Sequence, residues 1–142
     1  MFEKVKNIAC FLMILTVSGG VNTCYSQCDN ADFSQQNFNN WVGRTGSCCA
    51  INTPTVGIVN GRHTIMTGAG SDPVACNDIT FVAPGYSASA RLGNNQPGCQ
   101  AERLSYTYNV TPQSALFTYQ YAVVLEDPGH SPADQPRFEI RV

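Results

Sequence analysis

The chain has 142 residues and a formal net charge of −2, and only 13 % of its residues are charged. Its eight Lys and Arg residues are scattered along the sequence. Nucleic acids and anionic membrane surfaces are bound through clustered basic side chains, so this composition argues against both as partners. The length suggests one domain.

The first 26 residues have the pattern of a secretory signal peptide. Lys4 and Lys6 form a basic start, and an apolar run extends from Ile8 to Val17. This run is too short for a bilayer span, which needs about 20 residues, and it matches the hydrophobic part of a signal. Small residues allow cleavage after Gly20 or Ser26. We expect residues 27–142 to be secreted or displayed at the cell surface, without a transmembrane span; an uncleaved anchor is the alternative.

The cysteines fit an exported chain, in which disulfides persist. Cleavage after Gly20 would leave six cysteines, and cleavage after Ser26 would leave five. Zinc is the rival interpretation, but only Cys24 and Cys28 have a suitable spacing and no second pair matches them. Adjacent Cys48 and Cys49 are expected to join different partners, and the sequence does not choose among the pairings. The disulfide candidates are Cys24, Cys28, Cys48, Cys49, Cys76 and Cys99.

Short apolar segments between turn residues predict strands along residues 28–103. Residues 28–46 are expected to form an opening strand and a loop whose aromatic side chains dock on the core. Apolar pieces follow at 55–59 and 62–67, the run at 79–83 predicts a central strand, and 86–92 alternates as a half-buried strand does. Many short strands with Gly and Pro turns, and no helical period, predict an all-β, antiparallel β-sandwich of the jelly-roll type.

The last third of the chain alternates most regularly. Residues 104–110, 117–125 and 137–142 each place apolar side chains at every second position. We expect large Tyr and Phe rings from these segments to pack against Ala88 and Ala90, because large and small side chains complement each other in a core. The pattern continues to Val142, which predicts a sandwich incomplete at its C-terminus, with an unpaired edge.

Loops at one end of a sandwich usually carry its binding site. The candidates are the loops at 93–100 and 126–135 and the region of Trp41, although a lone Trp is more often packing than a sugar-stacking platform. His63 shares a face with Ile65 and is expected to be a structural histidine bonded to a backbone group. The ligand-binding candidates are Trp41, Asn94, Asn95 and His130.

The 126–135 loop is also a candidate calcium-binding site. It carries three carboxylates, and calcium takes six to eight oxygen ligands. The spacing matches no calcium motif, so a solvated loop stiffened by proline is the favoured interpretation and a calcium site the alternative. The metal candidates are Glu126, Asp127 and Asp134.

No catalytic motif is present in the sequence. It contains no Gly-x-Ser-x-Gly, no His-Glu-x-x-His and no phosphate-binding glycine loop. A carboxylate pair for glycoside cleavage is a matter of spatial separation, so it stays open for Glu102, Glu126, Asp127 and Glu139. Glu139 is expected to pair with surface charges on neighbouring strands. We expect the chain not to be an enzyme.

Several segments of the sequence are similar to those of a known group of proteins: residues 61–66, 89–94, 102–106, 121–130 and 135–138. They resemble the N-terminal region of large secreted surface proteins of gliding bacteria of the Bacteroidetes type. Such proteins continue into PKD-type β-sandwich repeats and a gliding-motility-associated C-terminal sorting domain used by type IX secretion. The resemblance implies a jelly-roll domain, similar to MAM-like or lectin-like sandwiches, displayed outside the cell.

These observations favour an extracellular binding or adhesion module, an adhesin, whose ligand is a glycan or an extracellular protein. The expected partners include downstream domains of the same polypeptide, and no cofactor other than calcium is implied. The alternatives are a structural spacer without a ligand, and an accessory domain of a secreted polysaccharide hydrolase or peptidase.

Overall fold

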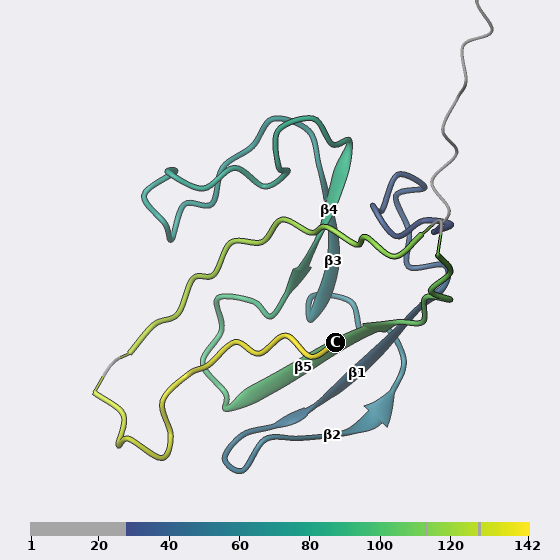
Figure 1. The fold of residues 1–142 in the computed structure, drawn as a ribbon. Helices are drawn as coiled ribbons and strands as arrows, with labels where there is room; N and C mark the ends of the chain where they lie inside the picture. Colours follow the sequence, from purple (N-terminus) through teal and green to yellow (C-terminus); the bar gives the residue numbers. More distant parts are fainter. Residues whose placement is uncertain (1–27, 113, 128) are drawn as a thin grey trace, which may run out of the picture.

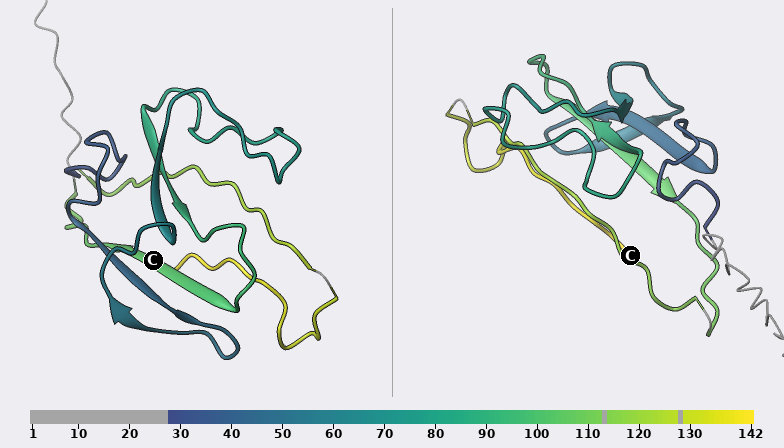
Figure 2. Two further views of the ribbon diagram at one scale, coloured as in Figure 1. Left: turned by 180° about the vertical axis from the view of Figure 1, so that it is seen from behind. Right: turned by 90° about the horizontal axis from the view of Figure 1, so that it is seen from above.

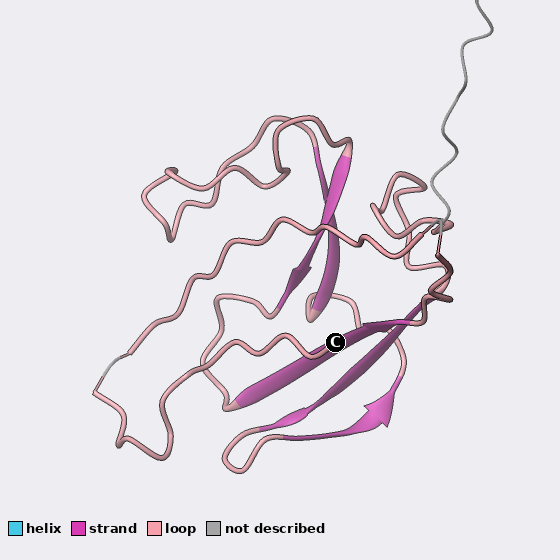
Figure 3. Ribbon diagram, viewed as in Figure 1, coloured by secondary structure: helices cyan, strands magenta, loops and turns pink. Residues whose placement is uncertain are grey.

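The computed structural model describes residues 28–112, 114–127 and 129–142, which contain five strands and no helix (Figures 1 and 3). The predicted signal peptide and Cys24 lie outside the described residues. No helix in the described part has the length and apolarity needed to cross a membrane. The strands are β1 (Trp41–Ser47), β2 (Asn52–Val56), β3 (His63–Thr67), β4 (Ala88–Leu92) and β5 (Gln100–Tyr106).

The strands form two antiparallel sheets, consistent with a β-sandwich. One sheet has the order β2-β1-β5, and the other pairs β3 with β4. The ladder between β1 and β5 runs without interruption from Trp41 opposite Tyr106 to Ser47 opposite Gln100. Between β1 and β2 the register shifts near Gly46, where an added Cβ would collide with the carbonyl group of Asn52. The predicted all-β class is therefore confirmed.

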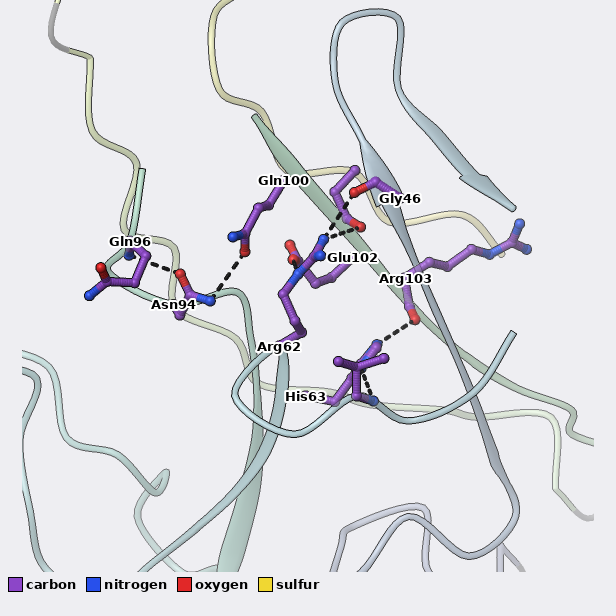
Figure 4. A network of polar contacts seen from close by, with 10 residues as sticks. Gly46, Arg62, His63, Asn94, Gln96, Gln100, Glu102 and Arg103 are labelled. Carbon is purple, nitrogen blue, oxygen red and sulfur yellow. Dashed lines mark hydrogen bonds and ion pairs between the residues drawn. The ribbon is translucent and has the colours of Figure 1, made fainter. Parts of the chain in front are cut away.

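A polar bridge joins the two sheets. Arg62, which precedes β3, pairs through Nε with the Glu102 carboxylate of β5. Its Nη2 donates to the carbonyl oxygens of Gly46 and Ala101, at 3.1 and 3.0 Å (Figure 4). The Arg62 and Glu102 side chains are only 19 % and 11 % exposed. Two backbone carbonyls and one carboxylate thus hold the start of β3 against the larger sheet.

His63 forms the second link between the sheets. Its side chain is buried, its Nδ1 accepts from the Val59 N–H at 3.1 Å, and its Nε2 lies 3.2 Å from the Arg103 carbonyl oxygen (Figure 4). Because Nδ1 accepts a hydrogen bond, the ring hydrogen lies on Nε2, which donates it to the backbone carbonyl oxygen of Arg103. The prediction of a structural histidine bonded to the backbone is confirmed.

The segment before β1 packs against the larger sheet. Buried Asn30 bonds through its amide to the carbonyl oxygens of Asn37 and Asn39, both at 3.0 Å. Phe33 stacks on Trp41 with ring centroids 4.6 Å apart, and Phe38 meets the His63 ring edge-on. The expectation that these aromatic side chains dock on the core is confirmed. The predicted opening strand corresponds to β1.

The predicted central strand at 79–83 is wrong. This run forms only an isolated bridge, between Thr80 and Ser71. Phe81 N–H donates to the Gly70 carbonyl oxygen at 2.9 Å, and Asp72 N–H donates to that of Ile79 at 2.8 Å. The run therefore folds back on the nearby 70–72 turn, and its pairing ends after these bonds.

The strands predicted in the last third are also wrong beyond Tyr106, where β5 ends. Residues 115–126 and 135–142 are extended, yet no described residue in either segment makes a backbone–backbone hydrogen bond. They run in a layer of their own beside the sheets, drawn yellow-green to yellow (Figure 2). Alternation is present, but a strand also needs a partner for its N–H and C=O groups, and these segments have none among the described residues.

Candidate functional site

Five aromatic rings in the last third form one continuous line, here called the aromatic row. Ring centroids are 6.0 Å apart from Tyr108 to Phe117, 6.2 Å from Phe117 to Tyr119, 6.0 Å from Tyr119 to Tyr121, and 5.4 Å from Tyr121 to Phe138. The row therefore connects the end of the β5 segment to both extended segments. Its members are Tyr108, Phe117, Tyr119, Tyr121 and Phe138.

The backbone explains how the row forms. Alternate side chains of an extended chain point to one side, so residues 117, 119 and 121 lie side by side. A turn brings Tyr108 to them: Ser114 Oγ accepts from the Thr111 N–H at 3.0 Å, and Tyr108 donates its hydroxyl hydrogen to the Ser114 carbonyl oxygen at 2.7 Å. The ring of Tyr108 is thus fixed at one end of the row.

The row is open to solvent. Phe117 is 46 % exposed, Tyr119 49 %, Tyr121 64 % and Phe138 45 %. Aromatic side chains of this size dominate binding energetics when they become buried, and an exposed patch of them marks an interaction site. This surface is the strongest candidate for a functional site in the described part of the chain.

Rings of the row border the same broad, open space as Ala88, Ala90 and Leu104 of the two sheets. Figure 2 shows the layer that carries the row standing apart from these strands. The predicted packing of large rings against the two alanines is therefore wrong: both groups line the same space from different sides, and the rings stay exposed.

Trp41 does not belong to this surface. It stacks on Phe33, lies 4.9 Å from the Tyr106 ring, and donates from Nε1 to the Asn30 carbonyl oxygen at 2.9 Å. These contacts give Trp41 the packing role that a lone tryptophan usually has.

Asn94, Asn95 and His130 lie on exposed loops. Asn94 donates to Gln100 Oε1 at 3.1 Å and accepts from the Gln96 N–H at 2.8 Å (Figure 4). Asn95 Oδ1 accepts from Gln96 Nε2 at 3.1 Å. The His130 N–H donates to Asp127 Oδ1 at 2.8 Å. The two asparagines form a small amide cluster, while His130 belongs to another loop.

The structure brings together two of the three predicted binding regions. The loops at 93–100 and 126–135 approach each other, since the charge of Asp134 contributes to the raised pKa of the Cys99 thiol. Trp41 starts β1, whereas Ser47 at the other end of β1 pairs with Gln100. Six residues of strand at about 3.3 Å each separate the two ends by about 20 Å. Trp41 is thus remote from both loops.

The carboxylates predicted to bind calcium are held locally. Asp127 accepts from the Gly129 and His130 N–H groups and from Gln135 Nε2, and these bonds, led by that of Gln135, lower its pKa. Asp134 accepts from the Ser131 hydroxyl at 2.7 Å. Among the described residues, no three His, Cys, Asp or Glu side chains are grouped so that they could hold a metal ion. The calcium site with Glu126 stays a prediction without support from this geometry.

The other carboxylates proposed for glycoside cleavage have ionic partners. Glu102 is bound by Arg62 between the sheets. Glu139 lies 2.6 Å from Arg141 and 3.7 Å from Arg137, and the hydrogen bond from Arg141 is the main cause of its lowered pKa. Its partners are neighbours on its own segment, not on adjacent strands as expected.

The described cysteines that were predicted to form disulfides lie in three separate parts of the fold. Cys48, Cys49 and Cys99 gather at the end of β1, Cys76 lies exposed in the 72–78 turn, and Cys28 lies near Tyr106. The pKa of Tyr106 is raised, first by burial and then by the charges of Cys28 and Asp29.

Sequence reasoning found the rings of the row but assigned them to the core. The period-two pattern gave no signal against that assignment, because a buried face and a binding face have the same period. Comparison with known proteins adds no relative from which a function could be taken, since no family model, no curated protein and no solved structure matches the chain.

Proposed function

We propose that this chain is an extracellular binding module that holds a glycan chain along the aromatic row. The observation that carries the proposal is the continuous line of five rings, four of them 45–64 % exposed. A line of ring faces offers repeated contacts to a ligand that is itself a repeating chain.

The chemistry of the surface favours a neutral sugar polymer. The apolar faces of sugar rings pack on aromatic rings, while the sugar hydroxyls need hydrogen-bonding partners. The hydroxyls of Tyr119 and Tyr121 supply such donors and acceptors within the row itself. Residues 117–125, which carry three of the five rings, contain no charged side chain, so an ionic ligand has no counterpart along this stretch.

The export pattern of the sequence and its resemblance to bacterial surface proteins support an adhesive role outside the cell. The spacer alternative has no comparable support, because a domain without a ligand needs no row of solvent-exposed rings. Aromatic side chains exposed without a ligand favour aggregation, so their placement needs a reason.

Affinity electrophoresis in gels containing neutral polysaccharides tests the proposal. We expect retardation on at least one polysaccharide, and loss of it in Tyr119→Ala and Tyr121→Ala. Tyr86→Ala is the matched control, since Tyr86 is 45 % exposed but lies outside the row. Parallel gels with calcium and with a chelator show whether the predicted calcium site takes part.

Two results would contradict the proposal. One is equal retardation of the row variants and the parent. The other is a change of oligomeric state in the row variants without any polysaccharide binding by the parent, which would make the row a protein contact.

A further inference from the structure

We propose that Cys48 and Cys99 form the disulfide bond that closes the end of the β1–β5 ladder. The inference is independent of the glycan proposal. It rests on strand register, on a backbone hydrogen bond and on the proximity of the thiols.

The register places the two residues opposite each other. Ser47 of β1 pairs with Gln100 of β5, so the next step along the antiparallel ladder sets Cys48 against Cys99. The Cys48 N–H donates to the Cys99 carbonyl oxygen at 2.9 Å, which extends the pairing beyond the strands. Opposed residues in such ladders have Cα atoms about 4.5–5.5 Å apart, within the 4.4–6.8 Å that a disulfide spans.

The Cys48 thiol lies close enough to Cys99 to raise the pKa of the Cys99 thiol. The charge of the Cys48 sulfur, followed by its hydrogen bond, is the main cause of the raised pKa of Cys99. A hydrogen bond with Cys48 also raises the pKa of Cys49 to about 12. Cys48 is thus the centre of a group of three unpaired thiols.

The same contacts favour Cys48 over Cys49 as the partner of Cys99. Cys49 does not figure among the groups that raise the pKa of Cys99, whereas Cys48 and Asp134 do. The sequence predicted that Cys48 and Cys49 join different partners, and the present proposal names Cys99 as the partner of Cys48.

The bond forms by thiol–disulfide exchange with a small disulfide oxidant, such as oxidised glutathione. The Cys48 thiolate attacks one sulfur of the oxidant and releases one glutathione thiolate, which takes up the proton from Cys48. Cys99 then attacks the Cys48 sulfur of the mixed disulfide, giving the protein disulfide and a second glutathione. Two protein thiols are oxidised, and one oxidant disulfide is reduced to two thiols.

Peptide mapping tests the assignment. The chain is equilibrated in a glutathione redox buffer, alkylated, and digested with trypsin without reduction. Cleavage after Arg44, Arg62, Arg91 and Arg103 places Cys48 and Cys49 on peptide 45–62, Cys76 on 63–91 and Cys99 on 92–103. We expect peptides 45–62 and 92–103 to be joined, with a mass lower by two hydrogens than their sum, and to separate on reduction.

Two variants distinguish the adjacent cysteines. Cys49→Ser should retain the joined peptides, and Cys48→Ser should lose them. Fragmentation of the joined peptide from the parent, between positions 48 and 49, locates the bond if either variant fails to fold. A bond from Cys49 to Cys99, a bond from Cys99 to Cys28 or Cys76, or alkylated Cys99 in the oxidised parent would each overturn the inference.

Discussion

The two sheets and the last third of the chain have similar alternating sequences but differ in how their backbones are bonded. β1 and β5 pair over seven consecutive positions, from Trp41 opposite Tyr106 to Ser47 opposite Gln100. Residues 115–126 and 135–142 are extended too, yet their described residues make no backbone–backbone hydrogen bond. The difference shows that alternation determines which side chains share a face, while pairing depends on a partner that the segment itself does not supply.

The side chains of the two regions differ in the same way. In the sheets, polar groups are buried and bonded: Arg62 and Glu102 pair across the sheets, and His63 bonds to two backbone groups. In the last third, the rings of the aromatic row contact one another and remain exposed. The buried polar bonds of the first region stabilise the fold, whereas the rings of the second region form an exposed surface.

The largest expected effect comes from removing the polar bridge. Arg62→Ala leaves the Glu102 carboxylate without its ionic partner in a site that is largely shielded from water, and it removes the Arg62 hydrogen bonds to the carbonyl oxygens of Gly46 and Ala101. We expect the free energy of unfolding to fall by about 3 kcal/mol. Denaturant unfolding measures it.

Arg141→Ala is the matched control, because Arg141 pairs with Glu139 at an exposed site in the last third. An exposed pair is worth about 0–1 kcal/mol, so the change should be small. Equal losses in the two variants would remove the distinction between the regions.

A smaller contrast is expected between two aromatic side chains. Trp41→Ala removes a ring that stacks on Phe33 and bonds to Asn30, and it should lower the free energy of unfolding by about 2 kcal/mol. Tyr121→Ala removes an exposed ring of the row and should change it by less than about 0.5 kcal/mol. Thermal or denaturant unfolding of both variants measures the contrast, and a larger loss for Tyr121→Ala would show that the row belongs to the core.

The smallest effect concerns pH and the 126–135 loop. The hydrogen bond from Gln135, then those from the His130 and Gly129 N–H groups, lower the Asp127 pKa from 3.8. Because the folded pKa is depressed, these bonds are fully present above 3.8 and are lost as the pH falls through the lower, folded value. NMR titration of the Gly129 and His130 amide protons should therefore show a midpoint below 3.8.

Gln135→Ala is the control for this titration. It removes the largest cause of the shift, so the midpoint should move back up toward the ordinary value of an aspartate. A parent midpoint at or above 3.8 would show that the loop does not hold the carboxylate as described.

The sequence predicted the sheet region well where local signals agree. Strands β3 and β4 lie within the predicted 62–67 and 86–92 segments, since both combine alternation with flanking turn residues. His63 was predicted to bond to the backbone, and both of its ring nitrogens do. The Arg62 bridge was not predicted, because Arg62 and Glu102 are 40 positions apart and only the meeting of two sheets brings them together.

The last third shows the limit of sequence reasoning. Period-two patterning at Phe117, Tyr119 and Tyr121 correctly predicts that the rings share one side. It does not indicate whether that side is covered, because a buried face and a binding face have the same period. Asn94 was predicted as a binding residue because it lies in a loop, but its distance from Trp41 depends on the β1–β5 register, which is a tertiary property.

Hydrogen exchange of the backbone amides, read residue by residue on the chain without ligand, tests the contrast between the two regions most directly. We expect slow exchange in the β1–β5 ladder, whose amides are bonded, and fast exchange from Phe117 to Leu125, whose amides have no partner among the described residues. Protection of 117–125 equal to that of β5 would contradict the account, because it would show a paired strand where we describe an open binding surface.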